Sequence, residues 1–416
     1  MTLVKTSLLN GIAVLVRMIS LLGMNKILAM FVGPSGYAVF GQFYNAVQLI
    51  TNFSSGAINT GVTKYTAEYG DDLTFQKKIW KTAGTIAISG SIIFSVLIFF
   101  LSGELAGFFL NDESLAGVFK WFASFLTLFV INTLLLAILN GRKEIKSYVI
   151  ANIAGSLLSL VLTIWLGATY KLYGALVALG TYQSIAFFVT LYLCWKKEWF
   201  NLRDMFGHFD LDIAKNLAKY TVMSLTTAIC VPITHMLIRE YLGKHLGWDS
   251  AGLWEAMWRL SSAYLLLITA TLSVYYLPRI SELKKVEEVR SEIWNCFKLT
   301  IPFSILLGLV IYLLRDFVIE VLFSRSFLPM RSLFLWQLIG DTVKVGSWIL
   351  AYVFIGKGMV KYYVFSEIIF TFSFFFIIVA LEPHFGLESV AIGHALNYLL
   401  HFGFVYLALK KIGYVK

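Results

Sequence analysis

Apolar runs of about twenty residues recur along the whole chain, separated by short stretches that contain charges, Gly or Pro. About 20 apolar residues in a helix are enough to cross the hydrocarbon core of a bilayer, which is about 30 Å thick. Hydrophobic residues make up 58% of the 416 residues and charged residues 14%, and the mean hydropathy is +0.76. A soluble domain would be about 45 to 50% apolar. The sequence therefore predicts an all-α polytopic membrane protein.

The first apolar run is expected to be a retained span. A signal peptide would have a shorter apolar core and a cleavage site of small residues, whereas this run leads into Gly33-Pro34-Ser35-Gly36. The whole pattern predicts twelve transmembrane helices. They fall near residues 7–32, 37–63, 80–102, 116–139, 148–168, 173–195, 216–239, 251–276, 295–314, 332–355, 361–381 and 387–409.

The basic residues outside these spans lie mostly in the loops on one side of the membrane. Because cytoplasmic loops are enriched in Lys and Arg, both termini are expected to be cytoplasmic. The formal net charge of +10 is explained by this bias. It gives no support to a nucleic-acid partner.

Two halves of the chain resemble each other weakly. The loop Gly141–Tyr148 (GRKEIKSY) returns 215 residues later as Gly356–Tyr363 (GKGMVKYY). We expect an N-lobe at residues 1–196 with spans 1 to 6, a cytoplasmic amphipathic linker at residues 197–215, and a C-lobe at residues 216–416 with spans 7 to 12. Since each lobe has an even number of spans, the lobes are related by a pseudo-two-fold axis along the membrane normal. This architecture is typical of transporters that work by alternating access, although duplication can also persist in a scaffold protein.

Two cations lie inside the first apolar run, Arg17 and Lys26, and no acidic residue precedes Glu68. A charge near the bilayer centre costs about 2.5 to 3.5 kcal/mol on insertion scales, so we expect these residues to meet an anion. Nine helical residues at about 100° each place the two on opposite faces. Both can line one cavity only if the helix bends, and the alternative is that one of them pairs within its own lobe.

Three further cations are weaker candidates for the same cavity. Each has a carboxylate three or four residues away, so each could instead belong to an internal ion pair. The pairs are Lys64 with Glu68, Arg259 with Glu255, and Lys344 with Asp341. Arg239 is expected near the outer end of its span, in contact with solvent.

The first six predicted spans contain no Asp or Glu near mid-membrane. An exporter of organic cations would need an acid there, so the N-lobe favours anions. Arg and Lys suit phosphate, Arg as a bidentate fork and Lys as a point charge. His394 and His401 share one face of the last span and form either a proton relay or a buried pair with satisfied hydrogen bonds.

No catalytic residue, metal site or cofactor is expected, and the protein is expected not to be an enzyme. Asp210-Leu-Asp212 matches the DxD metal motif of nucleotide-sugar transferases, but its loop is too short for a catalytic domain. The chain has no GxxxxGK[ST] phosphate loop, and its three cysteines are isolated in sequence.

Several segments resemble the Wzx-type polysaccharide flippases of the multidrug/oligosaccharidyl-lipid/polysaccharide exporter superfamily, with similar length and spacing from end to end. They are KILAMFVGPSGYAVFGQF (26–43), NTGVTKYTAEY (59–69), ITATLSVYYLPRISEL (268–283) and LLRDFVIEVLFSRSFLPMRSLFLWQLIGDTVKVGSW (313–348). The basic positions of the family's first span fall on Arg17 and Lys26, and its VTKY segment supplies Lys64. Arg17 stands where a close relative within this family has a lysine, which keeps the charge but changes the geometry toward phosphate.

The resemblance implies a flippase that moves an undecaprenyl-pyrophosphate-linked oligosaccharide from the cytoplasmic to the periplasmic leaflet of a bacterial inner membrane. The glycan would be O-antigen or enterobacterial common antigen. Implied partners are this lipid-linked glycan, membrane lipid, and the polymerase and chain-length proteins of the same pathway. The substrate-binding set is then Arg17, Lys26, Lys64, Arg259 and Lys344. A cation or drug antiporter of the same superfamily is the alternative.

Overall fold

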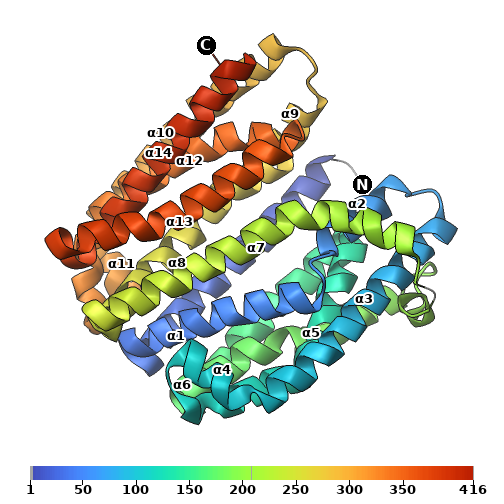
Figure 1. Cartoon of the computed structure of the whole chain (residues 1–416), viewed down its shortest axis with the longest axis horizontal. Coiled ribbons are helices and arrows are strands. Elements are labelled where there is room, and N and C mark those ends of the chain that lie inside the picture. The colour runs from blue at the N-terminus through green and yellow to red at the C-terminus, as the bar shows by residue number, and fades with distance from the viewer. Residues whose placement is uncertain (1–2, 208, 416) are drawn as a thin grey trace. The chain divides into compact units, whose positions relative to one another are not determined.

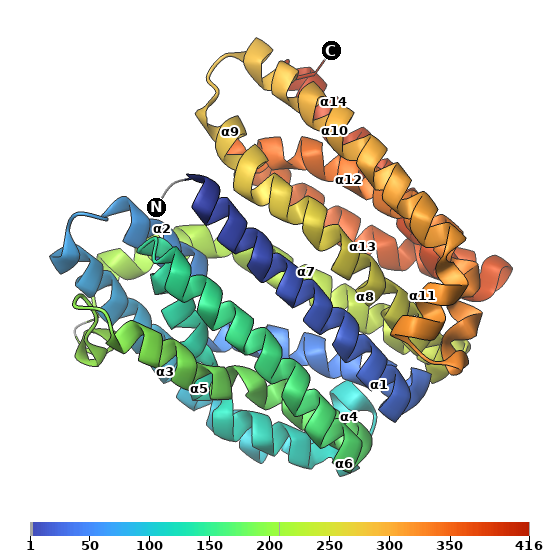
Figure 2. The same ribbon diagram turned by 180° about the vertical axis from the view of Figure 1, so that it is seen from behind.

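The structure is a computed structural model that describes the backbone of residues 3–207 and 209–415, and the side chains of residues 11–207, 209–217, 225–273 and 275–415. Within these ranges every regular element is a helix and none is a strand. The chain divides into two compact units (Figures 1 and 2). The N-unit contains the chain up to Phe31 and Val39–Pro232, and the C-unit contains Val32–Ala38 and the chain from Ile233 onward.

The N-unit is organised around α5, which is buried along most of its length. Helix α5 packs against α2, α3, α4 and α6, and its Phe119 and Phe122 meet Phe43 of α1 edge to face. The N-unit elements are α1 (Leu3–Ser54), α2 (Asn59–Glu68), α3 (Leu73–Phe100), α4 (Ser102–Leu110), η1 (Glu113–Leu115), α5 (Ala116–Gly141), α6 (Ile145–Trp195), η2 (Leu202–Met205) and the first part of α7 (Leu211–His245).

The C-unit is organised around α12 in the same way. Helix α12 packs against α8, α9, α10, α13 and α14, and both ribbon views show it beside α13 and α14. After the end of α7, the C-unit contains α8 (Trp248–Thr271), the π-helical turn η3 (Leu272–Tyr276), α9 (Leu277–Glu282), α10 (Val286–Leu313), α11 (Arg315–Leu322), η4 (Arg325–Leu333), α12 (Phe334–Gly356), α13 (Val360–Phe385), η5 (Gly386–Glu388) and α14 (Ser389–Ile412).

The backbone supports the weak sequence repeat. Helices α5 and α12 end at Gly141 and Gly356, 215 residues apart, and α3 and α10 both have 28 residues. Lys171 interrupts α6 with φ 51° and ψ −129°, and Gly386, also 215 residues later, has φ 52° and ψ −130°. A side chain is strained at such a positive φ, so its presence at Lys171 shows that the turn is fixed by the surrounding fold.

Seven helical segments in the described chain are long and apolar enough to cross a membrane. Three of them, Gly11–Ser54, Ile145–Trp195 and Val360–Ile412, have 44, 51 and 53 residues. At about 1.5 Å per residue each is more than twice as long as the hydrocarbon core is thick. Each is interrupted within its length, at Gly33, at Lys171 and at Gly386 respectively. The chain is therefore a multi-pass membrane protein, and the number twelve stays a prediction.

A short strap, residues Val32–Ala38, belongs to the C-unit although it lies within α1. The Ser35 amide donates to the Asp249 carboxylate at 3.1 Å, and the Tyr37 ring packs against Phe327 at a centroid distance of 5.6 Å. The compact units thus do not follow the boundaries 1–196, 197–215 and 216–416. The physical reason is that Gly33, at φ 66°, breaks α1 and lets the strap pack on α8.

In the described part of the linker the regular elements are the short turn η2, which lies against α3, and the first residues of α7. The amphipathic character of the linker stays a prediction. Asp204 pairs with Lys77 at 3.0 Å and Lys81 at 3.7 Å. Asp210 caps α7 by accepting from the backbone amides of residues 212 and 213, which gives the DxD motif a structural role. Ion pairs of Asp204 with α3 therefore hold this part of the linker against the N-unit.

Gly252 of α8 lies directly against the strap. A Cβ atom there would be 1.7 Å from the Pro34 carbonyl oxygen. We expect Gly252→Ala to lower the free energy of unfolding by about 1 to 3 kcal/mol, because backbone cannot move aside as a side chain can. The measurement is the midpoint of thermal unfolding in detergent. Gly403→Ala is the control, since nothing lies within 4 Å of that Cβ; equal midpoints for the two variants would contradict the packing argument.

The loop between α5 and α6 carries a second testable contact. Glu144 accepts from Lys197 at 2.7 Å and from the Trp199 indole at 3.2 Å. Burial raises the pKa of Glu144, but these bonds and the charges of Lys197 and Arg142 outweigh it, so the pKa lies below the ordinary value of 4.5.

A lowered folded-state pKa stabilises the protein above the unfolded-state pKa, and the gain is lost as the pH falls through the folded-state pKa. We therefore expect Glu144→Gln to lower the unfolding midpoint at pH 7, with a difference from the wild type that shrinks once the pH falls below about 4.5. Thermal unfolding at several pH values measures this. Glu198→Gln, at an exposed neighbouring position, should show no such trend, and a pH-independent loss in Glu144→Gln would refute the assignment.

Candidate functional site

The N-unit places the first two predicted cations on one uninterrupted stretch of helix. The only non-helical residue inside α1 is Gly33, so α1 does not break between Arg17 and Lys26. Arg17 is exposed and Lys26 is half-buried, as expected for residues on opposite faces. No break in the helix brings the two cations onto one face, and their joint role in one cavity stays a prediction.

Arg17 has a polar neighbourhood on α6. Its charge acts on the phenol of Tyr182, which accepts a hydrogen bond from the Gln183 amide at 3.3 Å. Asn132 of α5 in turn donates to Gln183 at 2.5 Å. The amides of Asn132 and Gln183 were not predicted from the sequence, because single Asn and Gln residues in apolar runs have no spacing signal.

Lys64 is in the ion pair that its spacing allowed. Its ammonium lies 3.6 Å from the Glu68 carboxylate, and the two side chains are 45% and 49% exposed. Such an exposed pair contributes little to stability, about 0.3 to 0.5 kcal/mol. Asn45, whose polar side chain could have faced a cleft, is buried and donates to the Pro232 carbonyl at 3.3 Å within the N-unit.

In the C-unit, Arg259 lies in a buried charge cluster. Glu255 accepts from Arg259 at 2.6 Å and pairs with Arg239 at 3.5 Å. Arg239 is 1% exposed, so the expectation that it meets solvent was wrong. Helix α7 instead presents it to α8, where it also lies 5.8 Å from the Trp254 ring. One carboxylate thus balances two guanidinium groups, and a charge this deep must be paired.

Lys344 occupies an aromatic cage. Its ammonium lies 4.5 Å from the Trp258 ring centroid, 4.9 Å from that of Trp348 and 5.1 Å from that of Tyr398. The side chain is buried. Asp341, the carboxylate one turn before it on α12, is engaged elsewhere. Cation–π attraction therefore replaces much of the hydration that Lys344 loses.

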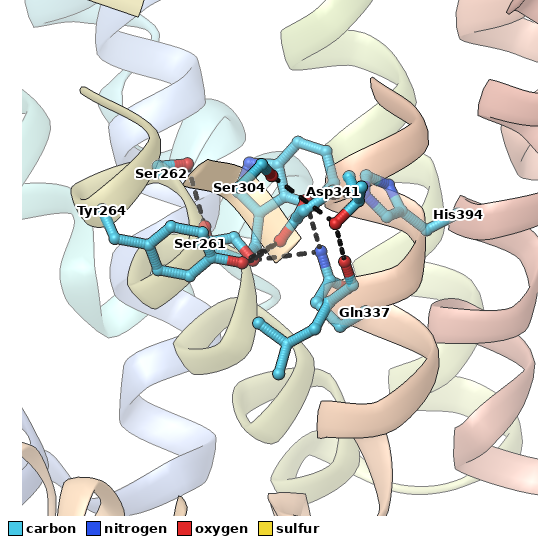
Figure 3. A network of polar contacts seen from close by, with 10 residues as sticks. Ser261, Ser262, Tyr264, Ser304, Gln337, Asp341 and His394 are labelled. Carbon is cyan, nitrogen blue, oxygen red and sulfur yellow. Dashed lines mark hydrogen bonds and ion pairs between the residues drawn. The ribbon is translucent and has the colours of Figure 1, made fainter. Parts of the chain in front are cut away.

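Asp341 is the centre of a buried hydrogen-bond network where α8, α12 and α14 meet (Figure 3). One carboxylate oxygen accepts from the hydroxyls of Ser261, at 2.6 Å, and Tyr264. The other accepts from the Gln337 amide at 3.3 Å and lies 2.9 Å from Nε2 of His394. The sequence pointed only to Lys344, since partners 53 to 80 residues away carry no local pattern.

The two histidines of α14 both face α12. His394 meets Asp341, and Nδ1 of His401 lies 2.5 Å from the Ser347 hydroxyl. Among the residues whose side chains are described, no group of three or more His, Cys, Asp or Glu could hold a metal ion. The C-unit therefore offers fixed positive charges, the hydrogen-bonded carboxylates of Glu255 and Asp341, and imidazoles, a set suited to anions and protons.

The charge cluster gives a direct test of its electrostatics. Glu255→Gln removes the buried carboxylate that pairs with the buried Arg239 and with Arg259, and we expect the free energy of unfolding to fall by about 3 to 5 kcal/mol. Glu240→Gln is the control: Glu240 forms a pair with Lys244 at 2.9 Å, but at the surface. Its loss should cost no more than about 0.5 kcal/mol. Similar unfolding midpoints for both variants would show that the buried cluster is not a stabilising unit.

Solved structures of similar fold define the class of protein. An inward-facing multidrug resistance MATE family transporter of the MOP superfamily has a TM-score of 0.76, with 18% identity, and the match covers 95% of this chain and 96% of that one. The inward closed conformation of the lipid II flippase MurJ has a TM-score of 0.74 at 13% identity and covers 98% and 87%. The chain is thus a multi-pass membrane protein with the two-lobed helical fold of MOP-superfamily transporters, as the sequence predicted.

The chain belongs to the polysaccharide biosynthesis protein family, whose family model matches residues 27–332. It is 28% identical over 369 residues to a protein named lipid III flippase from Escherichia coli (strain K12), and the match covers 88% of each chain. A lipid III flippase from Shigella flexneri matches equally well. The expected resemblance to polysaccharide flippases is confirmed.

Proposed function

We propose that this protein is a flippase that moves an undecaprenyl-pyrophosphate-linked oligosaccharide from the cytoplasmic to the periplasmic leaflet of a bacterial inner membrane. It would supply the synthesis of a cell-surface polysaccharide, O-antigen or enterobacterial common antigen. The observation that carries the proposal is the similarity to lipid III flippases over 88% of both chains. Family membership and a transporter fold support it.

In this proposal Arg17 is the first pyrophosphate contact. It is exposed, and its guanidinium can bind a phosphate with two parallel hydrogen bonds. Lys26 lies on the opposite face of α1 and remains a second predicted substrate cation. Lys64, Arg259 and Lys344 remain second-rank substrate cations, because each is held by groups of its own unit.

The charge of the substrate provides a driving force. Moving an anion outward across an inside-negative membrane releases about 2.3 kcal/mol per charge per 100 mV. Both termini would be cytoplasmic, and polymerase and chain-length proteins would act on the same glycan in the periplasm. No cofactor is needed for this step.

The alternative is a cation or drug antiporter, which the fold shared with a multidrug MATE transporter would allow. Such an antiporter needs a membrane-embedded acid that is open to its substrate. In the C-unit, Glu255 and Asp341 are each engaged by buried partners. Transport of a drug-like cation by the purified protein, with no flipping of lipid-linked glycan, would favour this alternative.

The test is a flipping assay in proteoliposomes at a clamped membrane potential. Flipping is read as protection of a labelled lipid-linked oligosaccharide from an external glycan-cleaving enzyme. Arg17→Ala removes charge-assisted bonds worth about 1.5 to 3 kcal/mol, so we expect the rate to fall about ten- to a hundredfold. Arg17→Lys should recover part of it.

Lys78→Ala, which removes an exposed cation from the start of α3, is the control and should flip at the wild-type rate. An unchanged rate in Arg17→Ala would remove the pyrophosphate role. Wild-type protein that does not flip the substrate at any potential would contradict the proposed function itself.

A further inference from the structure

The Asp341–His394 pair is more than a satisfied structural contact. Both side chains are at most 2% exposed and come from helices α12 and α14. A buried polar atom that lacks a hydrogen-bond partner destabilises the fold, so every polar atom of such a pair is expected to have one. Yet Nδ1 of His394 and Oε1 of Gln337, both in this network, have no hydrogen-bond partner among the described residues. The network is therefore incomplete at the imidazole.

The hydrogen-bond donors and acceptors of the pair allow two arrangements of its protons. If Nε2–H of His394 donates to ionised Asp341, Nδ1 is an acceptor with nothing to accept. In the other tautomer Nδ1 carries the proton, and Nε2 must accept from a protonated Asp341. The second arrangement holds one proton more than the first. The same 2.9 Å contact thus accommodates two protonation states of the pair, which differ by one proton.

We infer that the Asp341–His394 pair of the C-unit is a proton-binding site. One proton binds to the pair while the Nε2 to Oδ1 hydrogen bond is kept, and Ser261, Tyr264 and Gln337 hold the carboxyl in place. No bond to another group is broken. The ligand is the proton itself, taken from water and returned to it.

The surrounding charges set the consequence of proton binding. The groups facing the pair come from every helix packed around it: Lys344 on α12; Glu255, Arg259 and Tyr264 on α8; His235 and Arg239 on α7; Glu367 on α13; and Tyr398 on α14. Among these groups and the pair itself, three cations (Lys344, Arg239 and Arg259) are matched by three carboxylates (Glu255, Glu367 and Asp341). An added proton removes one negative charge, so an anion bound in the C-unit would favour protonation, and protonation would favour the anion equally.

Trp258 connects the proton site to the caged lysine. Its ring lies 5.4 Å from the His394 ring and 4.4 Å from the His235 ring, and the Lys344 ammonium lies 4.5 Å from its centroid. Before it takes up a proton, the Asp341–His394 pair carries one net negative charge that attracts Lys344; with the added proton the pair is neutral and this attraction is lost. Proton binding therefore weakens the hold of this site on Lys344. The further step, that the released lysine meets the pyrophosphate, rests on the proposed function.

Proton binding can be measured without transport. The chain has only six histidines, so NMR of ¹⁵N-histidine-labelled protein in nanodiscs can follow each imidazole from about pH 5 to 8. We expect one buried imidazole to titrate, and its signal to be lost in His394→Gln. This variant can still donate to Asp341 but cannot take up a proton. Asp341→Asn should shift the titration of the remaining His394.

His384→Gln, at an exposed position at the end of α13, is the matched control and should leave the buried titration unchanged. A His394 signal that stays in one state throughout this range would overturn the inference, and so would a change driven by sodium at constant pH. If His394→Gln does not fold, the titration of the wild type and of Asp341→Asn decides whether the pair binds a proton.

Coupling is tested in the same proteoliposomes as flipping. We expect wild-type flipping to depend on pH at a fixed membrane potential, and His394→Gln to lose this dependence while His384→Gln keeps it. Flipping at the same rate at all pH values would contradict the coupling of flipping to proton binding, but not the proposed function. A His394 that titrates in a protein that flips no substrate would contradict the proposed function, but not the proton-binding site.

Discussion

The cost of a charge in an apolar interior governs how each unit is built. In the C-unit every buried charge in the candidate site is matched: Glu255 lies between two guanidinium groups, Asp341 receives four hydrogen-bond contacts, and Lys344 is surrounded by aromatic rings. These contacts join α7, α8, α12 and α14, so they also hold the unit together. In the N-unit, Arg17 is exposed, as the proposed pyrophosphate contact requires.

The two units are built on one backbone plan but carry different chemistry. Central helices α5 and α12 end in equivalent loops, and the turns at Lys171 and Gly386 have nearly the same dihedral angles. The N-unit adds amides and an exposed arginine to this plan, and the C-unit adds an ion network. We interpret this difference as a division of labour, in which one unit binds the anionic headgroup and the other binds a proton.

Local patterns predicted what depends on neighbours in the chain. Apolar runs predicted helices that span the membrane, and spacing predicted the pairs Lys64–Glu68 and Arg259–Glu255. Spacing failed for Lys344, whose neighbour Asp341 is bound by residues of α8 and α14. Position along a span failed for Arg239, because the burial of a helix end depends on what packs there. The contacts of Asp204 with Lys77 and Lys81 of α3 had no local signal either, since these residues are far apart in the sequence.

The sequence by itself determined that the chain lies in a bilayer and that its fold is helical. About twenty apolar residues in a row can satisfy their backbone hydrogen bonds in a bilayer only as a helix. It also determined the duplication, through loop residues that each half needs for the same turn. Only the tertiary structure decided which charges are neutralised, and it did so by bringing His394 and Ser261 to Asp341 from 53 and 80 residues away. Such contacts depend on how helices pack side by side, and that information is not contained in the spacing along any one of them.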